Sequence, residues 1–199
     1  YKKGVSTSVA TKDSLPLFFN SIREPCNLKQ LRSGESNMFK LARDAGYKTY
    51  YISAQDSRVV DSESIKNIDY LWTKETHRLT FLNRRDEALL EFLPDINLEE
   101  GGNFIVFFMR SIHSPYENNY RHRREFAVYP ESGKDRDEYL KNTYDNATLY
   151  NDSFYEKAIS AFAKRAGENS MIFFTSDHGE MLGDRNIYGH TFLDPGVAE

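Results

Sequence analysis

The chain has 199 residues, of which 39% are hydrophobic and 14% aromatic; this is enough apolar surface for one large or two small folded domains and excludes a disordered chain. Its 26 basic and 30 acidic residues give a formal charge of −4, so it lacks the basic character of a general nucleic-acid binder. No apolar run approaches the roughly 18 residues that cross a bilayer, and the single cysteine, Cys26, excludes an internal disulfide or a cysteine-based zinc site.

The first part of the chain predicts two helices. Residues Leu15–Ile22 carry a short helical pattern. Asn37–Ala45 predicts a second helix, which Ser33 or Ser36 would cap and which Gly46 ends, because glycine suits the left-handed position after a helix.

Two buried strands follow, with a helix between them. The segments Lys48–Ser53 (KTYYIS) and Asn103–Met109 (NFIVFFM) are rich in aromatic and β-branched residues and do not alternate cleanly, which is typical of parallel strands covered on both faces. Arg85–Leu93 predicts the intervening helix, which Pro94 stops.

The last part of the chain predicts one long helix and a third strand. The polar stretch Tyr116–Arg136 leaves two interpretations open, an ordered excursion at the rim of the sheet or a disordered surface loop. Asp137–Arg165 predicts a long helix, because apolar residues recur there at spacings near three and four. Ser170–Ser176 (SMIFFTS) predicts a third buried strand.

This order of helices and strands predicts an α/β fold, with a doubly wound, mostly parallel sheet and helices on both faces. In such sheets, ligands bind beyond the carboxyl ends of the strands. His113 follows the second predicted strand, and Asp177, His178 and His190 follow the third, so three of the five histidines follow strand ends. The pattern indicates a metal or phosphate site.

The adjacent pair Asp177-His178 has two interpretations. Carboxylate oxygen and imidazole nitrogen are both ordinary zinc ligands. Neighbouring side chains on a regular strand point to opposite faces, so the pair converges only on an irregular turn, which Gly179 permits. Alternatively, Asp177 caps a helix that begins near Gly179, and His178 is a polar surface residue.

His113 and His190 suit a second role, in which they hold an anionic oxygen or a second metal ion. The alternative for each is a hydrogen-bonded loop histidine. That ordinary role is the one we expect for His77 and for His122, which lies in the solvated basic sequence RHRR.

Transfer of a phosphoryl or sulfuryl group also needs a nucleophile. The candidates in this chain are Ser6, Thr7 and Ser8, in GVSTSVAT. Small hydroxyl residues beside glycine are equally typical of plain loops, and no base neighbours them in sequence.

Five segments, in the same order, resemble the phosphoethanolamine transferases of Gram-negative bacteria, within the alkaline phosphatase and sulfatase superfamily. SDHGEMLGDRNIYGH resembles the signature of that family, and FMRSIHSPY resembles its histidine motif. GVSTSVAT, FKLARDAGYKTYYISAQ and NTYDNATLYNDSF resemble further family segments. SDHGE alone would indicate only the superfamily, whereas the Tyr-Asp-Asn helix makes the assignment narrower.

The resemblance implies an α/β domain on the periplasmic side of the bacterial inner membrane, tethered by a membrane segment. Such enzymes move phosphoethanolamine from phosphatidylethanolamine onto lipid A or a core sugar of lipopolysaccharide, through a phosphorylated threonine. By motif, Asp177 and His178 would be zinc ligands. His113 and His190 would contact the phosphate group or a second zinc ion.

Two parts of the family pattern find no match in this sequence. The nucleophilic threonine and an acidic zinc ligand are expected before Tyr1, and a later strand after Glu199. We therefore expect residues 1–199 to be a partial catalytic domain, truncated at both ends. With two of four ligands, these residues alone should bind zinc weakly or not at all and should not turn over substrate. The family's His-Gly-Pro is here His113-Ser114-Pro115, which leaves the subgroup open.

Two other functions remain open. The nearest is another enzyme of the superfamily, a sulfatase or a phosphoglycerol transferase. The second is a non-catalytic domain that binds anionic lipid or glycan, with Arg121, Arg123 and Arg124 as a phosphate grip.

Overall fold

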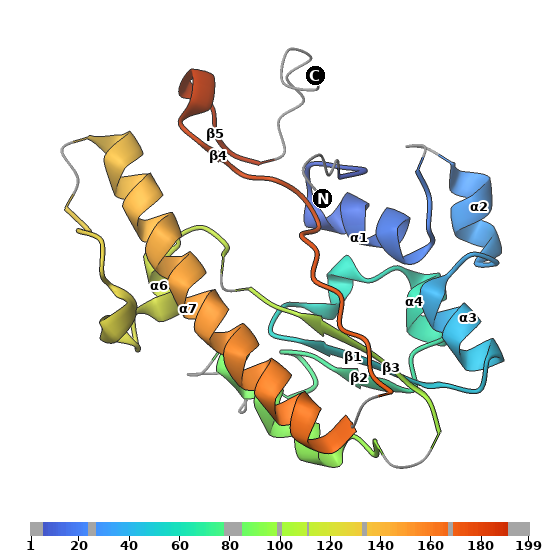
Figure 1. The fold of residues 1–199 in the computed structure, drawn as a ribbon. Helices are drawn as coiled ribbons and strands as arrows, with labels where there is room; N and C mark the ends of the chain where they lie inside the picture. The colour runs from blue at the N-terminus through green and yellow to red at the C-terminus, as the bar shows by residue number, and fades with distance from the viewer. Residues whose placement is uncertain are drawn as a thin grey trace. The chain divides into compact units, whose positions relative to one another are not determined.

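The structure is a computed structural model that describes residues 6–23, 27–77, 85–98, 101–110, 112–132, 135–166 and 169–190 (Figure 1). The chain forms two compact units. Unit 1 consists of Tyr1–Thr49, Arg58–Asp69 and Ile172–Glu199, and unit 2 of Tyr50–Ser57 and Tyr70–Met171. No helix in the described part of the chain is long and apolar enough to cross a membrane.

The described residues of unit 1 form four helices and a small hairpin. The helices are α1 (Thr11–Phe19), α2 (Leu28–Ser33), α3 (Met38–Asp44) and α4 (Ser62–Lys66). The hairpin pairs β4 (Met181–Leu182) with β5 (Tyr188–Gly189), and its loop holds the 3-10 turn η4 (Asp184–Asn186). A further turn, η1 (Ser57–Val59), precedes α4.

Helix α3 confirms the second predicted helix but not its predicted cap. The side chain of Asn37 accepts hydrogen bonds from the backbone N–H groups of Phe39 and Lys40, both at 3.1 Å, and so caps the helix. Ser33 or Ser36 was the wrong choice, because Asn37 lies directly before the first helical residue, where its oxygen reaches these donors. Ser36 instead donates to the carbonyl of Asn20 at 2.5 Å.

A buried polar network joins the end of α1 to the starts of α3 and α4. The amide of Asn37 donates to Asn20 Oδ1 at 3.1 Å and to Ser64 Oγ at 2.8 Å. Ser64 in turn donates to Asp61, which caps α4, at 2.7 Å. The aromatic rings of Phe19 and Phe39 pack at 5.1 Å beside it. The network therefore holds α1 in place within unit 1, and the first residue of α1 contacts the candidate site described below.

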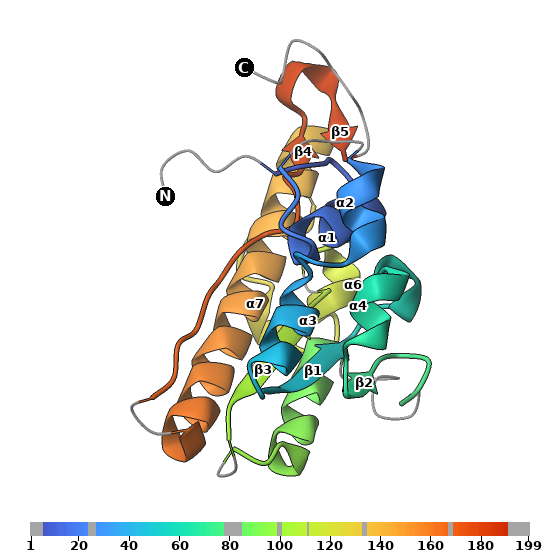
Figure 2. The same ribbon diagram turned by 90° about the vertical axis from the view of Figure 1, so that its right-hand side faces the viewer.

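The sheet has the strand order β2-β1-β3, and Figure 2 shows the three strands side by side. Its strands are β1 (Lys48–Ser53), β2 (Tyr70–Trp72) and β3 (Asn103–Phe108). The first and last confirm two predicted strands, whereas β2 was not predicted, because three residues carry too short a pattern. Strands β1 and β2 pair in parallel, with Tyr50 opposite Tyr70 and Ile52 opposite Trp72, which confirms an α/β fold with parallel pairing.

The core of unit 2 lies between this sheet and two helices. Tyr50 and Ile52 of β1 pack with Leu89 and Phe92 of η2 (Arg85–Asp95) and with Phe154 of α7 (Arg136–Ala166). The long predicted helix is confirmed to within one residue at each end. The predicted helix at residues 85–93 is a 3-10 helix and ends at Asp95, one residue past Pro94, so Pro94 does not stop it as predicted.

Residues Tyr116–Glu131, here called the strap, form an ordered excursion rather than a disordered loop. The strap contains α6 (Glu117–Tyr120) and η3 (Arg124–Phe126), and Tyr116 and Tyr120 are buried. Figure 1 shows it beside the first half of α7. Two side chains of the strap thus contribute to the core of unit 2.

The prediction of a strand at Ser170–Ser176 is wrong. The segment forms no strand, and Met171 and Phe173 are 77% and 83% exposed. A strand needs a neighbour that takes its backbone hydrogen bonds. No strand in the described residues pairs with this segment, so its apolar composition alone does not make it a strand.

Candidate metal and phosphate site

The His178 side chain is fixed in one tautomer by the backbone carbonyl of the next residue, Gly179. Its Nδ1 lies 2.8 Å from the carbonyl oxygen of Gly179. A carbonyl only accepts, so Nδ1 carries the proton and Nε2 carries the lone pair. The hydroxyl of Thr11, the first residue of α1, donates to Nε2 at 3.1 Å. The side chain is 10% exposed, so one ring atom is presented as a ligand atom from a largely buried position.

Asp177 and His178 converge on an irregular turn, which is one of the two interpretations that the sequence left open. Asp177 Oδ2 lies 3.6 Å from His178 Nε2. Two ligands of a tetrahedral zinc ion, each about 2.1 Å from the metal, lie about 3.4 Å apart, so the spacing fits a shared cation. The same Oδ2 is buried and has no hydrogen-bond partner in the described residues. The alternative in which Asp177 caps a helix is wrong, because residues 177–180 form a bend that leads into β4.

The β4–β5 hairpin brings Glu180 to His190. Met181 pairs with Gly189, so the residues just outside this pair become neighbours. Gly183, Arg185 and Asn186 close the loop with positive φ angles. As a result, His190 Nδ1 lies 2.7 Å from Glu180 Oε2.

Glu180 and His190 are spaced as a hydrogen-bonded pair. A carboxylate that accepts from Nδ1 orients the imidazole and leaves the lone pair on Nε2, the arrangement found behind many metal ligands and catalytic histidines. At 2.7 Å the two atoms are closer than two tetrahedral ligands of one ion. Glu180 is therefore placed to position His190.

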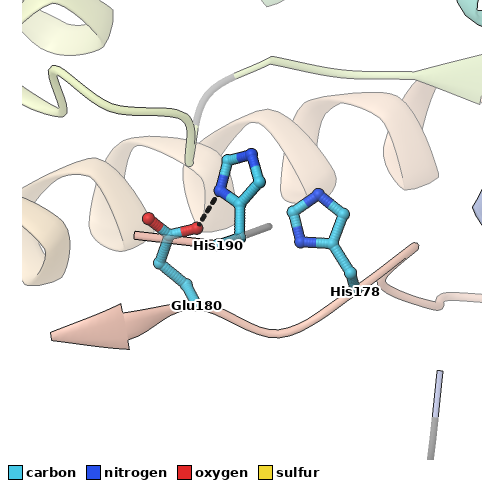
Figure 3. Close-up of side chains that lie close together, drawn as sticks. All are labelled: His178, Glu180 and His190. Carbon is cyan, nitrogen blue, oxygen red and sulfur yellow. Dashed lines mark hydrogen bonds and ion pairs between the residues drawn. The ribbon is translucent and has the colours of Figure 1, made fainter. Parts of the chain in front are cut away.

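Three side chains meet at this point of unit 1, as Figure 3 shows. One ligand atom each from His178, Glu180 and His190 lies within 4.8 Å of the others. The two imidazole rings are 4.4 Å apart at an angle of 35°. Nitrogen and carboxylate donors of this kind suit Zn²⁺. The residues present thus fit a divalent cation, with His178 and His190 as nitrogen donors, Glu180 behind His190, and the Asp177 carboxylate beside His178.

The structure brings together three of the four predicted site residues, Asp177, His178 and His190. His113 belongs to unit 2, and its place relative to the other three stays a prediction. Its local geometry matches that of His178, because its Nδ1 lies 2.6 Å from the carbonyl of the following residue, Ser114. The amide of Asn119 donates to the His113 carbonyl at 2.7 Å and fixes the backbone there.

Two contributors to the site were missed in the sequence. Glu180 lies two residues after His178 and ten before His190, and a hairpin prediction between the two would have paired them. Thr11 carries no such signal, because its contact with His178 depends on where α1 packs.

The three candidate nucleophiles lie in the loop before α1. Ser6 Oγ donates to the backbone carbonyl of Asp177, and the backbone N–H of Ser8 reaches Ser6 Oγ at 3.4 Å. The Ser6 hydroxyl therefore fastens this loop to the turn of the candidate site. Which hydroxyl attacks phosphorus stays a prediction.

Two of the three arginines considered as a phosphate grip, Arg123 and Arg124, are bound to carboxylates. Arg123 pairs with Glu87 and Glu125, and Arg124 makes two parallel hydrogen bonds to Glu131, both at 2.8 Å. Guanidinium groups that are already neutralised make a poor anion site. This argues against the binding-only alternative.

The two remaining histidines have the ordinary roles expected of them. His122 lies 3.8 Å from Glu87 and packs edge-on against Tyr150. His77 packs edge-on against Trp72 and Phe92.

The family model described as "Sulfatase" matches residues 1–193 of this chain. Among curated proteins, phosphoethanolamine transferase EptA of Helicobacter pylori is 30% identical over 156 residues, which are 73% of this chain and 29% of that protein. The Kdo(2)-lipid A phosphoethanolamine 7''-transferase of Salmonella typhimurium is 25% identical over 195 residues, 92% of this chain and 33% of that protein. The chain thus spans about a third of these relatives or less.

Among solved structures, the C-terminal periplasmic domain of EptC from Escherichia coli, in complex with Zn, superposes with a TM-score of 0.61. The match has 24% sequence identity and covers 78% of this chain and 47% of that one. This likeness confirms the fold class.

Proposed function

This chain belongs to the sulfatase family, and we propose that the protein carrying it transfers phosphoethanolamine from phosphatidylethanolamine to lipid A or to a core sugar of lipopolysaccharide. The observation that carries the proposal is the convergence of Asp177, His178, Glu180 and His190 in unit 1. The similarity to EptA and to the 7''-transferase supports phosphoethanolamine as the transferred group.

Asp177 and His178 are the residues that would hold a zinc ion in this proposal. Their ligand atoms, Oδ2 and Nε2, have the spacing that one ion requires. When bound, such an ion neutralises charge on phosphoryl oxygens and makes a hydroxyl a better nucleophile. The Nδ1–H of His178 donates to the Gly179 carbonyl, so the ring cannot turn away from the site without losing that bond.

His190 and His113 would act on the phosphate group itself. Each holds its Nδ1 proton against an oxygen acceptor, Glu180 in one case and the Ser114 carbonyl in the other. Nε2 is then the atom that accepts a proton from the attacking hydroxyl or, once protonated, donates to a phosphate oxygen. A carboxylate behind His190 stabilises the protonated form.

The remaining parts of the proposal follow the family resemblance. The attacking group would be a threonine outside these residues, giving a phosphothreonine intermediate that the acceptor hydroxyl displaces. Residues 1–199 would form part of a catalytic domain on the periplasmic side of the bacterial inner membrane, tethered by a segment elsewhere in the protein.

A transfer assay tests the proposal. Full-length protein is incubated with phosphatidylethanolamine labelled on an acyl chain and with lipid A, and release of labelled diacylglycerol is followed together with the mass of the lipid A. We expect diacylglycerol release matched by phosphoethanolamine addition, loss of both with a chelator, and recovery with Zn²⁺.

The matched variants are His178→Ala and His122→Ala. We expect the first to abolish transfer and the second to leave it within about threefold, because His122 contacts Glu87 and Tyr150 and is not one of the proposed site residues. Equal losses from both would contradict the ranking of the histidines. Hydrolysis of an aryl sulfate without release of diacylglycerol would favour the sulfatase alternative.

A further inference from the structure

Arg110 is the cation of unit 2 that the proposed function does not use. It follows β3 by two residues, and its backbone N–H donates to the buried carboxylate of Asp86 at 2.8 Å, which fixes the main chain there. Its side chain is half-buried, and Nε is buried with no hydrogen-bond acceptor. In the part of the chain that the structure describes, its guanidinium forms no ion pair.

Several other cations of the same unit have partners in the described residues. Arg123 and Lys157 share the carboxylate of Glu87, and Arg124 pairs with Glu131. Arg165 donates to two backbone carbonyls at the end of η2. A guanidinium stays charged at any ordinary pH, and a buried N–H donor without an acceptor is costly. The buried Nε–H of Arg110 therefore calls for an acceptor, and the charge of the group favours an anion.

The place of Arg110 in the sheet fits a ligand rather than a structural partner. Strands β1 and β3 end side by side, and the amide of Gln55, just after β1, donates to the carbonyl of Met109 at 3.1 Å. Ligands of open α/β sheets bind at such strand ends. His113 follows Arg110 by three residues, on the same connection.

We propose that Arg110 binds a tetrahedral oxyanion, the phosphoryl group of a phosphate ester, at the carboxyl ends of β1 and β3. The planar fork of the guanidinium matches two phosphate oxygens, and the main-chain bond to Asp86 holds the side chain at the end of the sheet. The source is a free phosphate monoester or the phosphodiester of a lipid headgroup. The inference deepens the proposed function, on which it rests, by naming a further phosphate-binding residue; its test needs neither a metal nor a transfer step, so its failure is distinguishable from a failure of the transfer assay.

Thermal unfolding and calorimetric titration of the full-length protein test the inference. A chelator is present throughout, so that phosphate cannot bind through a metal at the His178 site. The probes are inorganic phosphate and glycerophosphoethanolamine, which is a phosphodiester. We expect at least one probe to bind saturably and to raise the unfolding temperature, and the tighter probe identifies the source. Absence of saturable binding by both would overturn the proposal.

The test variant is Arg110→Gln and the control is Arg32→Gln, which removes an exposed arginine of α2 in unit 1. We expect Arg110→Gln to weaken binding of the probe by about tenfold or more, and Arg32→Gln to leave it unchanged. Without probe, Arg110→Gln should unfold at the same temperature as the native protein or above it, because a buried N–H donor without an acceptor is removed. A lower unfolding temperature without probe would show a protein partner and overturn the proposal, as would equal weakening by both variants.

Discussion

Asn146 provides a test of why the strap is ordered. This residue of α7 is fully buried and serves the strap with three hydrogen bonds. Its Oδ1 accepts from the backbone N–H of Tyr129 at 2.8 Å, and its Nδ2 donates to the Tyr129 carbonyl at 3.0 Å and to the Tyr120 hydroxyl at 3.3 Å. Each bond contributes about 1 kcal/mol, so Asn146→Ala should cost about 2–3 kcal/mol in the free energy of unfolding.

Such a loss lowers the unfolding temperature by roughly 5–10 °C in a chain of this size. Thermal unfolding measures it, and hydrogen exchange at the Tyr129 amide shows whether the strap detaches first. Asn142→Ala is the matched control, because Asn142 lies about one turn away on α7 and makes one exposed bond to Pro130, at 3.0 Å. Equal stability of native protein and Asn146→Ala, or equal losses in the two variants, would refute the reasoning.

Two further predictions concern charged pairs. Burial alone would raise the pKa of Glu87, but Lys157 and Arg123 hold that pKa below its ordinary value of 4.5. The carboxylate therefore stabilises the fold above about pH 4.5, and this stabilisation is lost as the pH falls through the lower pKa of the folded state. The stability of Glu87→Gln, measured by acid unfolding, should depend less on pH in that range. An unchanged pH profile of unfolding would contradict the assignment. Glu180→Ala should retain bound Zn²⁺ but slow transfer by about 10–100-fold, since it removes the group that orients His190; loss of the metal instead would make Glu180 a ligand.

The sequence predicted the fold where long patterns specify an element. The bounds of strand β1 and helix α7 were predicted almost to the residue. A buried aromatic run, and a helical pattern that continues along a 31-residue helix, leave few alternative structures. Strand β2 was missed because it has three residues and is defined by its pairing with β1. The error at residues 170–176 has the same origin, since an apolar run becomes a strand only beside a partner.

The site was predictable to the extent that it is local. Asp177 and His178 lie on one turn, so their convergence needed only an irregular backbone at Gly179. Glu180 was missed because its role depends on the β4–β5 hairpin, which has two residues in each strand. The contact of Thr11 with His178 spans 167 positions and follows from tertiary packing, which no local pattern records.

Zinc titration of metal-free full-length protein tests the central assignment most directly. With Asp177→Ala and with His178→Ala we predict affinity reduced by at least about tenfold, whereas His122→Ala, the control, should bind as the native protein does. The isolated 199-residue chain should bind more weakly than the full-length protein, because it supplies only part of the ligand set that the family resemblance implies. Unchanged zinc affinity in both Asp177→Ala and His178→Ala would contradict the account.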